Sequence, residues 1–380
     1  MSKAFINGDI FTGEEVLSGY TLYTDGDTIT DVSPESPCHS YDGEIIDCAG
    51  KTLAPGFIDI QVNGGGGVLF NDQTNADGIE AIVKAHQRFG TVAMLPTLIS
   101  DSHEKIQAAI TATDEAIAEK IPGVLGVHLE GPFLNPERKG VHNPEYFSAL
   151  ENDFVPMLSA LKTGATLVTM APEQSQPEIV KQLSNNGVLV FAGHTGASYQ
   201  QTKVALNNGL KGFTHLFNAM TPMLSREPGV VGAALEDTHS WCGIIVDGYH
   251  VDNASLKVAI AAKATGKMVL VTDAMPTVGA EDKRFVLNGE EIVAKNGRCA
   301  TAADTLAGSD LDMISAVNNT VKWLDVDWQE AIRMASTYPA QCLGVDHHYG
   351  FLAQGYKASF VVLDQQLNLD SVWVEASRID

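Results

Sequence analysis

The sequence predicts an α/β protein: a (β/α)8 barrel of the TIM type with a small β-sandwich domain built from both chain termini. Two observations support this fold class. Strand-like apolar runs alternate with helical stretches through the middle of the chain, as in a parallel barrel. Short strand-like segments separated by turn residues fill both ends. We expect the N-terminal part of the β domain at 1–53, the barrel at 54–350 and the C-terminal part of the β domain at 351–380.

Both ends of the chain consist of short apolar runs that stop at turn residues. Asn7-Gly8 and Asp25-Gly26 mark two of these turns. Because neither end shows helical periodicity, we expect the two ends to combine in one small β domain. The predicted strands are 4–6, 20–24, 28–32 and 45–48 near the N-terminus, and 360–363 and 371–374 near the C-terminus.

The middle of the chain supplies eight predicted strands, the number that a closed parallel barrel requires. A doubly wound open sheet is the alternative, but no G-x-G-x-x-G follows the first strand. We interpret the four glycines at 64–67 as a flexible active-site loop, and a tight turn without ligand contact is the alternative. The predicted strands are 57–62, 92–95, 124–129, 166–170, 188–192, 212–214, 242–246 and 268–272, and the predicted helices are 77–89, 103–120, 176–185, 198–208 and 253–265.

Composition indicates an ordinary globular enzyme. With 380 residues, 44% of them hydrophobic and 19% charged, the chain has room for a barrel and a smaller domain. Its apolar runs fall well short of the ~20 residues that span a bilayer. The N-terminus lacks the long apolar region of a secretory signal. We therefore expect a cytoplasmic protein with no membrane partner.

Charge and cysteine usage exclude further classes. The net charge of −23 disfavours nucleic acid and anionic membranes as partners, so an anionic small molecule needs a local cationic site. The five scattered cysteines form no C-x-x-C pair, which favours reduced thiols over a disulfide framework or a zinc ribbon. These cysteines are Cys38, Cys48, Cys242, Cys299 and Cys342.

Polar residues with metal-binding chemistry stand where the predicted strands end. Glu130 ends the third strand, and Gly131-Pro132 terminates any regular element there. His194 and His215 follow the fifth and sixth strands, and Asp273 follows the eighth. Because the carboxyl ends of barrel strands meet at one face, these side chains are expected to converge on a metal site. A helix cap or a buried ion pair is the structural alternative for Asp273.

Five segments give the chain a likeness to a known family: 54–59 (APGFID), 128–133 (HLEGPF), 192–195 (AGHT), 214–220 (THLFNAM) and 271–274 (VTDA). The chain resembles the amidohydrolase superfamily, and within it the branch that deacetylates N-acetylglucosamine 6-phosphate. The resemblance covers essentially the whole chain. It implies metal-dependent hydrolysis of the acetamide of N-acetyl-D-glucosamine 6-phosphate to D-glucosamine 6-phosphate and acetate, in amino-sugar catabolism.

The resemblance also implies roles for the residues at the strand ends. Glu130, His194 and His215 would bind one divalent ion, with Zn²⁺ expected and Fe²⁺, Co²⁺, Mn²⁺ or Ni²⁺ as alternatives. Asp273 would act as general base and then protonate the departing amine, and His142 would stabilise the oxyanion. Most superfamily members hold a second metal through His-x-His at the first strand. Here Gln61-x-Asn63 replaces that pair, which implies a single metal.

A sugar-phosphate site follows from the same resemblance. Arg226 and His250 would bind the phosphate, since a guanidinium matches phosphate oxygens, although Arg226 could also form a surface ion pair. In relatives such an arginine can come from a neighbouring subunit, so a homodimer or a higher homo-oligomer is expected. The expected substrate-binding residues are Gln61, Asn63, Val141, Asn218, Ala219, Arg226, His250, Leu306, Ala307, Gly308 and Ser309.

Other functions stay open. The substrate could be another N-acetylated sugar phosphate, such as the galactosamine epimer. A cyclic amidase would need His-x-His and a bridging lysine, and neither is evident at these strand ends. A barrel that has lost its chemistry and serves as a scaffold is a non-enzymatic alternative. The presence of all four metal-site and base residues favours an enzyme.

Overall fold

The computed structural model describes residues 1–34 and 41–379. The chain divides into two compact units. One contains Met1–Asp59, His86–Ala93 and Met313–Asp380, and the other contains Ile60–Ala85 and Met94–Asp312. The domain boundaries expected from the sequence, near residues 53 and 350, stay a prediction.

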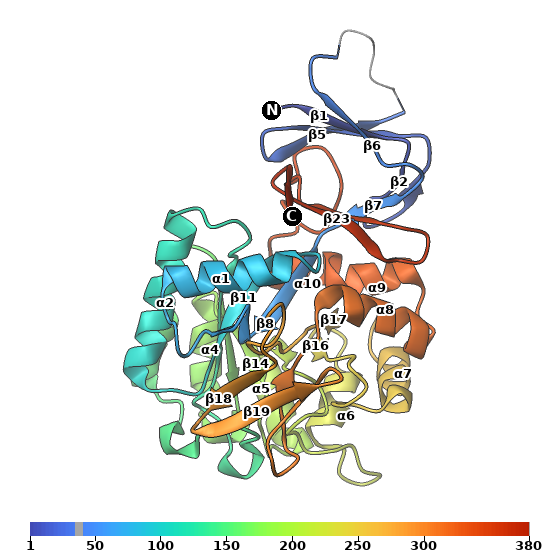
Figure 1. Ribbon diagram of the computed structural model, residues 1–380. Helices are drawn as coiled ribbons and strands as arrows, with labels where there is room; N and C mark the ends of the chain where they lie inside the picture. The colour runs from blue at the N-terminus through green and yellow to red at the C-terminus, as the bar shows by residue number, and fades with distance from the viewer. Residues whose placement is uncertain (35–40, 380) are drawn as a thin grey trace. The chain divides into compact units, whose positions relative to one another are not determined.

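An eight-stranded sheet forms the barrel, as the sequence predicts (Figure 1). Neighbouring strands from β11 to β17 pair in parallel. A parallel bridge between Val62 and Ala274 joins the end of the first strand to the chain beyond the last, so the sheet is nearly closed. In spatial order the strands are β8 (Phe57–Val62), β11 (Thr91–Ile99), β12 (Gly126–Glu130), β13 (Ala165–Met170), β14 (Leu189–Ala192), β15 (Gly212–Phe213), β16 (Trp241–Ile244) and β17 (Met268–Leu270).

The five predicted helices are confirmed, and local sequence explains their ends. Ser198 caps its helix in a capping box with Gln201, and Ser102 and Asp252 cap two others through their side-chain oxygens. The sequence suggests a strand without clear bounds after Gly229, but this segment forms a buried helix. The helices of this part of the chain are α1 (Ala76–Gln87), α2 (His103–Ala118), α3 (Val155–Leu158), α4 (Pro177–Asn185), α5 (Tyr199–Asn207), α6 (Gly229–Glu236) and α7 (Asn253–Ala262).

A four-stranded antiparallel sheet between β17 and α8 was not predicted. Asn288-Gly289 and Asn296-Gly297 form its first two turns, and all four residues have positive φ, the conformation that such two-residue turns require. The glycines at 64–67 form a hairpin and do not line the cavity described below, which agrees with the tight turn rather than with the flexible active-site loop. The strands are β9 (Gly64–Gly65) and β10 (Val68–Leu69) in that hairpin, and β18 (Arg284–Leu287), β19 (Glu290–Lys295), β20 (Arg298–Ala300) and β21 (Leu306–Ser309) in the sheet.

Strands from both chain ends form the small β-sandwich, as predicted (Figure 1). Strand β22 (Phe360–Leu363) pairs with β7 (Thr52–Pro55), so the C-terminal strands extend an N-terminal sheet. Phe5, Phe360 and Trp373 meet ring to ring in the core. The other strands are β1 (Lys3–Ile6), β2 (Asp9–Phe11), β3 (Val16–Leu17), β4 (Thr21–Asp25), β5 (Thr28–Ser33), β6 (Glu44–Asp47), β23 (Leu369–Val374) and β24 (Ser377–Ile379), and the helices of this unit are α8 (Met313–Leu324), α9 (Trp328–Ala335) and α10 (Thr337–Leu343).

Two further features bear on the expectations from composition. In the described part of the chain, no helix is long and apolar enough to cross a membrane. Four cysteines, Cys48, Cys242, Cys299 and Cys342, are buried and form no disulfide. Cys38 lies outside the described residues.

Candidate active site

Three buried side chains form a compact group at the carboxyl ends of the barrel strands. Glu130 is the last residue of β12, and His194 and His215 follow β14 and β15. Nε2 of His215 lies 3.0 Å from Oε1 of Glu130 and 3.1 Å from Nε2 of His194. Nε2 of His194 lies 3.4 Å from the same carboxylate oxygen. Zinc ligands at bond lengths of ~2.0–2.1 Å in a tetrahedron lie about 3.3 Å apart, so the spacing fits a metal ion.

The hydrogen bonds around His194 also fit a metal ligand. Nδ1 of His194 lies 2.8 Å from the carbonyl oxygen of Arg138. A carbonyl only accepts, so Nδ1 carries the proton and the lone pair of Nε2 points into the group. Burial alone would raise the pKa of Glu130, but the two histidines hold it well below its ordinary range. The group therefore offers an ionised carboxylate and a correctly oriented imidazole.

His215 is protonated more readily than a free histidine. Burial lowers its pKa, but the hydrogen bond to Glu130 and the charge of that carboxylate raise it more, and the net shift is upward. A metal ligand must be deprotonated, so metal binding at this group releases a proton. Affinity for a divalent ion therefore falls as the pH falls through the pKa of His215.

A second buried carboxylate, Asp273, lies beside this group. Oδ1 of Asp273 accepts hydrogen bonds from Nδ2 of Asn63 at 2.6 Å and from Nε2 of Gln61 at 3.2 Å. Gln61 Nε2 also donates to Oε2 of Glu130, so one amide bridges both carboxylates. Burial and the charge of Glu130 raise the pKa of Asp273. Because both amides bond to Oδ1, Oδ2 is the oxygen left for proton transfer.

The backbone is strained where these side chains enter the site. His194, His215 and Asp273 have φ of 49°, 34° and 52°, in the left-handed region that residues other than glycine rarely occupy. Strain of this kind persists only where the surrounding structure holds it, and it is common at active sites. The amide nitrogen of Asp273 donates to the carbonyl of Gln61, which contributes to holding this turn.

His142 is held as a neutral hydrogen-bond donor. The backbone N–H of Ser100 donates to Nδ1 of His142 at 3.3 Å, and the Ser100 hydroxyl lies 2.8 Å from the same nitrogen. Nδ1 is therefore the acceptor, which places the proton of the neutral ring on Nε2. Burial, together with the neighbouring His194, lowers the pKa of His142 to about 3. The ring thus donates from Nε2 without carrying a charge near neutral pH.

A cavity of about 250 Å³ joins these groups. It brings together all five of the proposed metal-site and catalytic residues, and most of the proposed substrate-binding ones. Four lining residues were not predicted as contacts, among them Ile99, which ends β11, and Met275, which follows Asp273. Ile99 stands at a strand end, so the rule that found the ligands could have found it, whereas Met275 lies well beyond the end of β17. The predicted residues that line the cavity are Glu130, His194, His215, Asp273, His142, Asn63, Val141, Asn218, Ala219, His250, Leu306 and Gly308, and the additional ones are Ile99, Gly140, Met275 and Thr305.

His250 is oriented by its neighbour Asp247. Nδ1 of His250 lies 2.6 Å from Oδ2 of Asp247, and the backbone N–H groups of Tyr249 and His250 donate to Oδ1 of that carboxylate. Burial alone would raise the pKa of Asp247, but these hydrogen bonds lower it below its ordinary value. The aspartate is therefore ionised, and it fixes the histidine ring at the cavity wall.

Four proposed substrate-binding residues do not line the cavity. Gln61 lies behind it and bonds to the two carboxylates. Ala307 is buried in an apolar cluster, and the hydroxyl of Ser309 donates to the carbonyl of Thr272. Arg226 is exposed, on a loop with exposed Met223 and Leu224.

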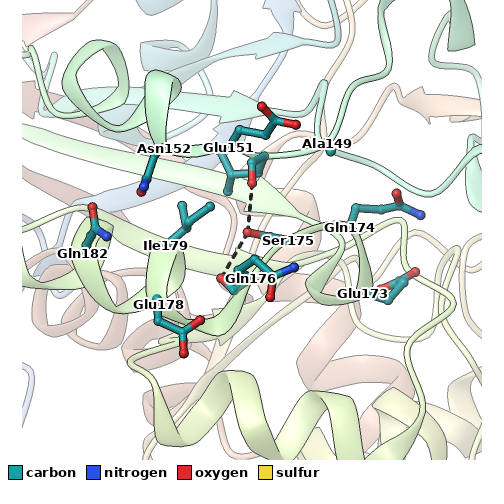
Figure 2. Close-up of a pocket in the computed structure, with 11 residues that line it drawn as sticks. Ala149, Glu151, Asn152, Glu173, Gln174, Ser175, Gln176, Glu178, Ile179 and Gln182 are labelled. Carbon is teal, nitrogen blue, oxygen red and sulfur yellow. Dashed lines mark hydrogen bonds between the residues drawn. The ribbon is translucent and has the colours of Figure 1, made fainter.

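A carboxylate that sequence reasoning missed, Glu173, supports the position of His194. Glu173 accepts hydrogen bonds from the hydroxyl of Thr195 at 2.5 Å, from the N–H of Gly196 at 2.6 Å and from Nδ2 of Asn135 at 2.8 Å. The N–H of Asn135 in turn donates to the carbonyl of His194. Figure 2 shows Glu173 on the wall of a separate hollow, which is lined by side chains from 149–152 and 173–182.

Replacing Glu173 by Gln is expected to weaken metal binding about 10-fold, the lower end of the cost of losing a residue that supports a metal ligand. The amide cannot accept all three hydrogen bonds, so the loop that carries His194 loosens. Competition with a chelating dye measures the dissociation constant. Glu178→Gln is the matched control, because Glu178 is exposed on the wall of the same hollow. Equal affinities in the two variants would contradict this role.

The fold and the site together define a hydrolase built on a metal-binding barrel. The chain belongs to the amidohydrolase family, whose model matches residues 52–378. It is 36% identical over 365 residues to the N-acetylglucosamine-6-phosphate deacetylase of Haemophilus influenzae, covering 95% of each chain. It is 39% identical to the N-acetylgalactosamine-6-phosphate deacetylase of a Shewanella species, over 85% of this chain and 82% of that one.

A solved structure agrees with these relatives. The crystal structure of N-acetylglucosamine-6-phosphate deacetylase from Pasteurella multocida matches with a TM-score of 0.95 and 34% identity. The match covers 100% of this chain and 99% of that one. The similarity therefore includes the terminal β strands as well as the barrel.

Proposed function

We propose that this enzyme hydrolyses the acetamide of N-acetyl-D-glucosamine 6-phosphate to D-glucosamine 6-phosphate and acetate, in amino-sugar catabolism in the cytoplasm. The observation that carries the proposal is the Glu130–His194–His215 group beside Asp273, in a chain similar along its length to sugar-phosphate deacetylases. The galactosamine epimer is the second candidate substrate, because the Shewanella relative acts on that sugar and is 39% identical.

Glu130, His194 and His215 are proposed to hold one Zn²⁺ ion. When bound, the ion lowers the pKa of water and polarises the amide carbonyl. Support for a single ion comes from Gln61, whose amide bridges Glu130 and Asp273. The N–H groups of Gln61 stabilise both carboxylates, so a second cation is not needed for that purpose.

Asp273 is proposed to move the proton. Its raised pKa makes it a stronger base than an ordinary carboxylate, so Oδ2 can take a proton from the attacking water. The same group then delivers that proton to the sugar nitrogen as the C–N bond breaks. The second transfer is needed because an unprotonated amine is a poor leaving group.

His142 is proposed to stabilise the carbonyl oxygen as negative charge develops there. Its Nε2–H is available because Ser100 occupies Nδ1. A neutral donor of this kind is already oriented before the reaction begins, and such a donor is worth ~10²–10³ in rate. With its pKa lowered to about 3, the ring stays neutral and is a weaker base than Asp273, whose pKa is raised.

The sugar phosphate is proposed to bind at the side of the cavity that follows β15 and β16. Asn218, Ala219 and His250 line this side. Oδ1 of Asn63 is buried and has no hydrogen-bond partner among the described residues, so it can accept a hydrogen bond from the substrate. Leu306 and Gly308 contribute from the β20–β21 segment.

Arg226 is proposed to act across the interface of a homodimer. It is exposed and does not line the cavity of its own chain, although a phosphate dianion needs a cation in a protein with a net charge of −23. Replacing Arg226 by Ala is expected to raise the KM for the sugar phosphate by about 10-fold or more, since a charged hydrogen bond is worth ~1.5–3 kcal/mol. An unchanged KM would remove Arg226 from the site.

The experiment that tests the function compares acetate release from four substrates by the zinc-loaded protein. N-acetylglucosamine 6-phosphate and N-acetylgalactosamine 6-phosphate are each run beside their unphosphorylated sugars. We expect turnover of the phosphorylated glucosamine derivative and little from the unphosphorylated sugars. A higher kcat/KM for the galactosamine derivative would make that sugar phosphate the preferred substrate and the glucosamine derivative the second candidate. No release from any of the four, with zinc bound, would refute the proposal.

A further inference from the structure

One wall of the cavity is apolar. Ile99 and Met275 line it, and both side chains are almost fully buried. They belong to a cluster that includes Leu287, Ile292 and Ala307 from the β18–β21 sheet. The sheet that the sequence did not predict therefore backs this wall of the site.

These two apolar side chains stand next to the two reactive carboxylates. Ile99 is the register partner of Glu130 on the neighbouring strands β11 and β12. Met275 lies two residues beyond Asp273, and backbone hydrogen bonds to Ser309 hold both of these residues. The wall thus flanks the two carboxylates beside which the reacting amide must lie.

The substrate amide has three groups around its reacting carbon. The oxygen needs His142 and the metal site, and the nitrogen carries the sugar toward Asn218 and His250. The acyl substituent is left facing the β8, β11 and β17 side of the barrel. The apolar residues lie there, and a methyl group gains from such contacts.

We infer that Ile99 and Met275 form the acyl pocket and restrict the substrate to short N-acyl groups such as acetyl. The inference rests on the proposed function and extends it to the acyl side of the substrate. It assigns to this wall a role in specificity: the pocket selects the length of the acyl chain.

The side chains of this wall have little space to move away from a longer acyl chain. Gly308 has φ of +55°, and a Cβ atom added there would lie 2.7 Å from Cγ of Met275 and 2.8 Å from the carbonyl oxygen of Asp273. Met275 is therefore packed closely against Gly308, which lines the same cavity. Close-packed interiors resist the insertion of even one methylene.

The test measures kcat/KM of the zinc-loaded enzyme for N-acetyl-, N-propionyl- and N-butyryl-glucosamine 6-phosphate. The wild type is expected to prefer acetyl. Met275→Ala and Ile99→Val are each expected to raise the propionyl-to-acetyl ratio, by about 10-fold or more for Met275→Ala, since one methylene in an apolar pocket discriminates by ~10–200-fold. Leu69→Ala is the control, because Leu69 is in the same cluster but does not line the cavity.

The outcomes separate this inference from the proposed function. If the wild type hydrolyses the acetyl substrate but neither variant changes the propionyl-to-acetyl ratio, the assignment of the acyl pocket is wrong. The proposed deacetylase function is then unaffected. The same holds if Leu69→Ala changes the ratio as much as the two variants. If Met275→Ala does not fold, Ile99→Val decides, because it removes a single methylene. No turnover of any glucosamine derivative by the wild type would refute the proposed substrate first.

Discussion

Replacing Asp273 by Asn is expected to lower kcat by at least about 10³-fold and to leave metal binding intact, within the ~10²–10⁴ range of general acid–base catalysis. Asn has nearly the same shape, but it can neither accept the proton of water nor protonate the amine. Both transfers fail in this variant, which places the loss toward the upper part of that range. Steady-state acetate release measures the rate, and elemental analysis measures the metal content.

A matched control separates loss of the base from a general effect of an Asp-to-Asn change. Asp252 caps α7 by accepting from the N–H of Ala254, and asparagine caps helices as well as aspartate does. Asp252→Asn is therefore expected to keep wild-type kcat. If Asp273→Asn retains a tenth or more of the wild-type kcat, Asp273 is not the proton carrier. If that variant loses its metal, the residue is part of the metal site instead.

Removal of the metal by a chelator is expected to reduce acetate release to background. The remaining protein still has the base Asp273 and the donor His142, but neither generates a strong nucleophile at neutral pH. Metal removal is also expected to lower the thermal midpoint, because an ion at 100 times its dissociation constant stabilises the native state by ~2.7 kcal/mol. Adding back Zn²⁺, Fe²⁺, Co²⁺, Mn²⁺ or Ni²⁺ in separate samples ranks the metals by restored activity.

The variant His194→Gln tests the same dependence on metal. It is expected to retain the fold but lacks one nitrogen ligand. We expect that added metal does not restore its activity and that chelation does not shift its thermal midpoint. A chelated wild-type protein that is shown by elemental analysis to lack metal and is still fully active would rule out metal-dependent hydrolysis. Restoration of His194→Gln by stoichiometric zinc would remove His194 from the ligand set.

Most of the fold was predictable because its signals are local. Each barrel strand is an apolar run bounded by turn residues, and each predicted helix has a regular pattern, so both are visible in a single window of sequence. The β18–β21 sheet was missed although Asn288-Gly289 and Asn296-Gly297 mark its turns. Its strands are short and partly exposed, with weak apolar alternation.

The candidate metal group was predictable for a related reason. Parallel strands present their carboxyl ends at one face, so the position of Glu130, His194 and His215 at the ends of the third, fifth and sixth strands was enough to expect them together. Contacts that depend on loops were not predictable in this way. Arg226 does not lie in the cavity of its own chain, and Glu173 supports His194 from a loop after another strand.

The sequence by itself determined the barrel, the terminal β domain and the identity of the residues at the strand ends, because strand order places those ends together. Only the tertiary structure decided the hydrogen bonds and the protonation states of these residues. Gln61 bridges carboxylates that are 69 and 212 residues away along the chain. Ser100 sets the tautomer of His142 from 42 residues away. These states depend on hydrogen-bond partners that meet only when separate strands and loops come together at the same face of the barrel.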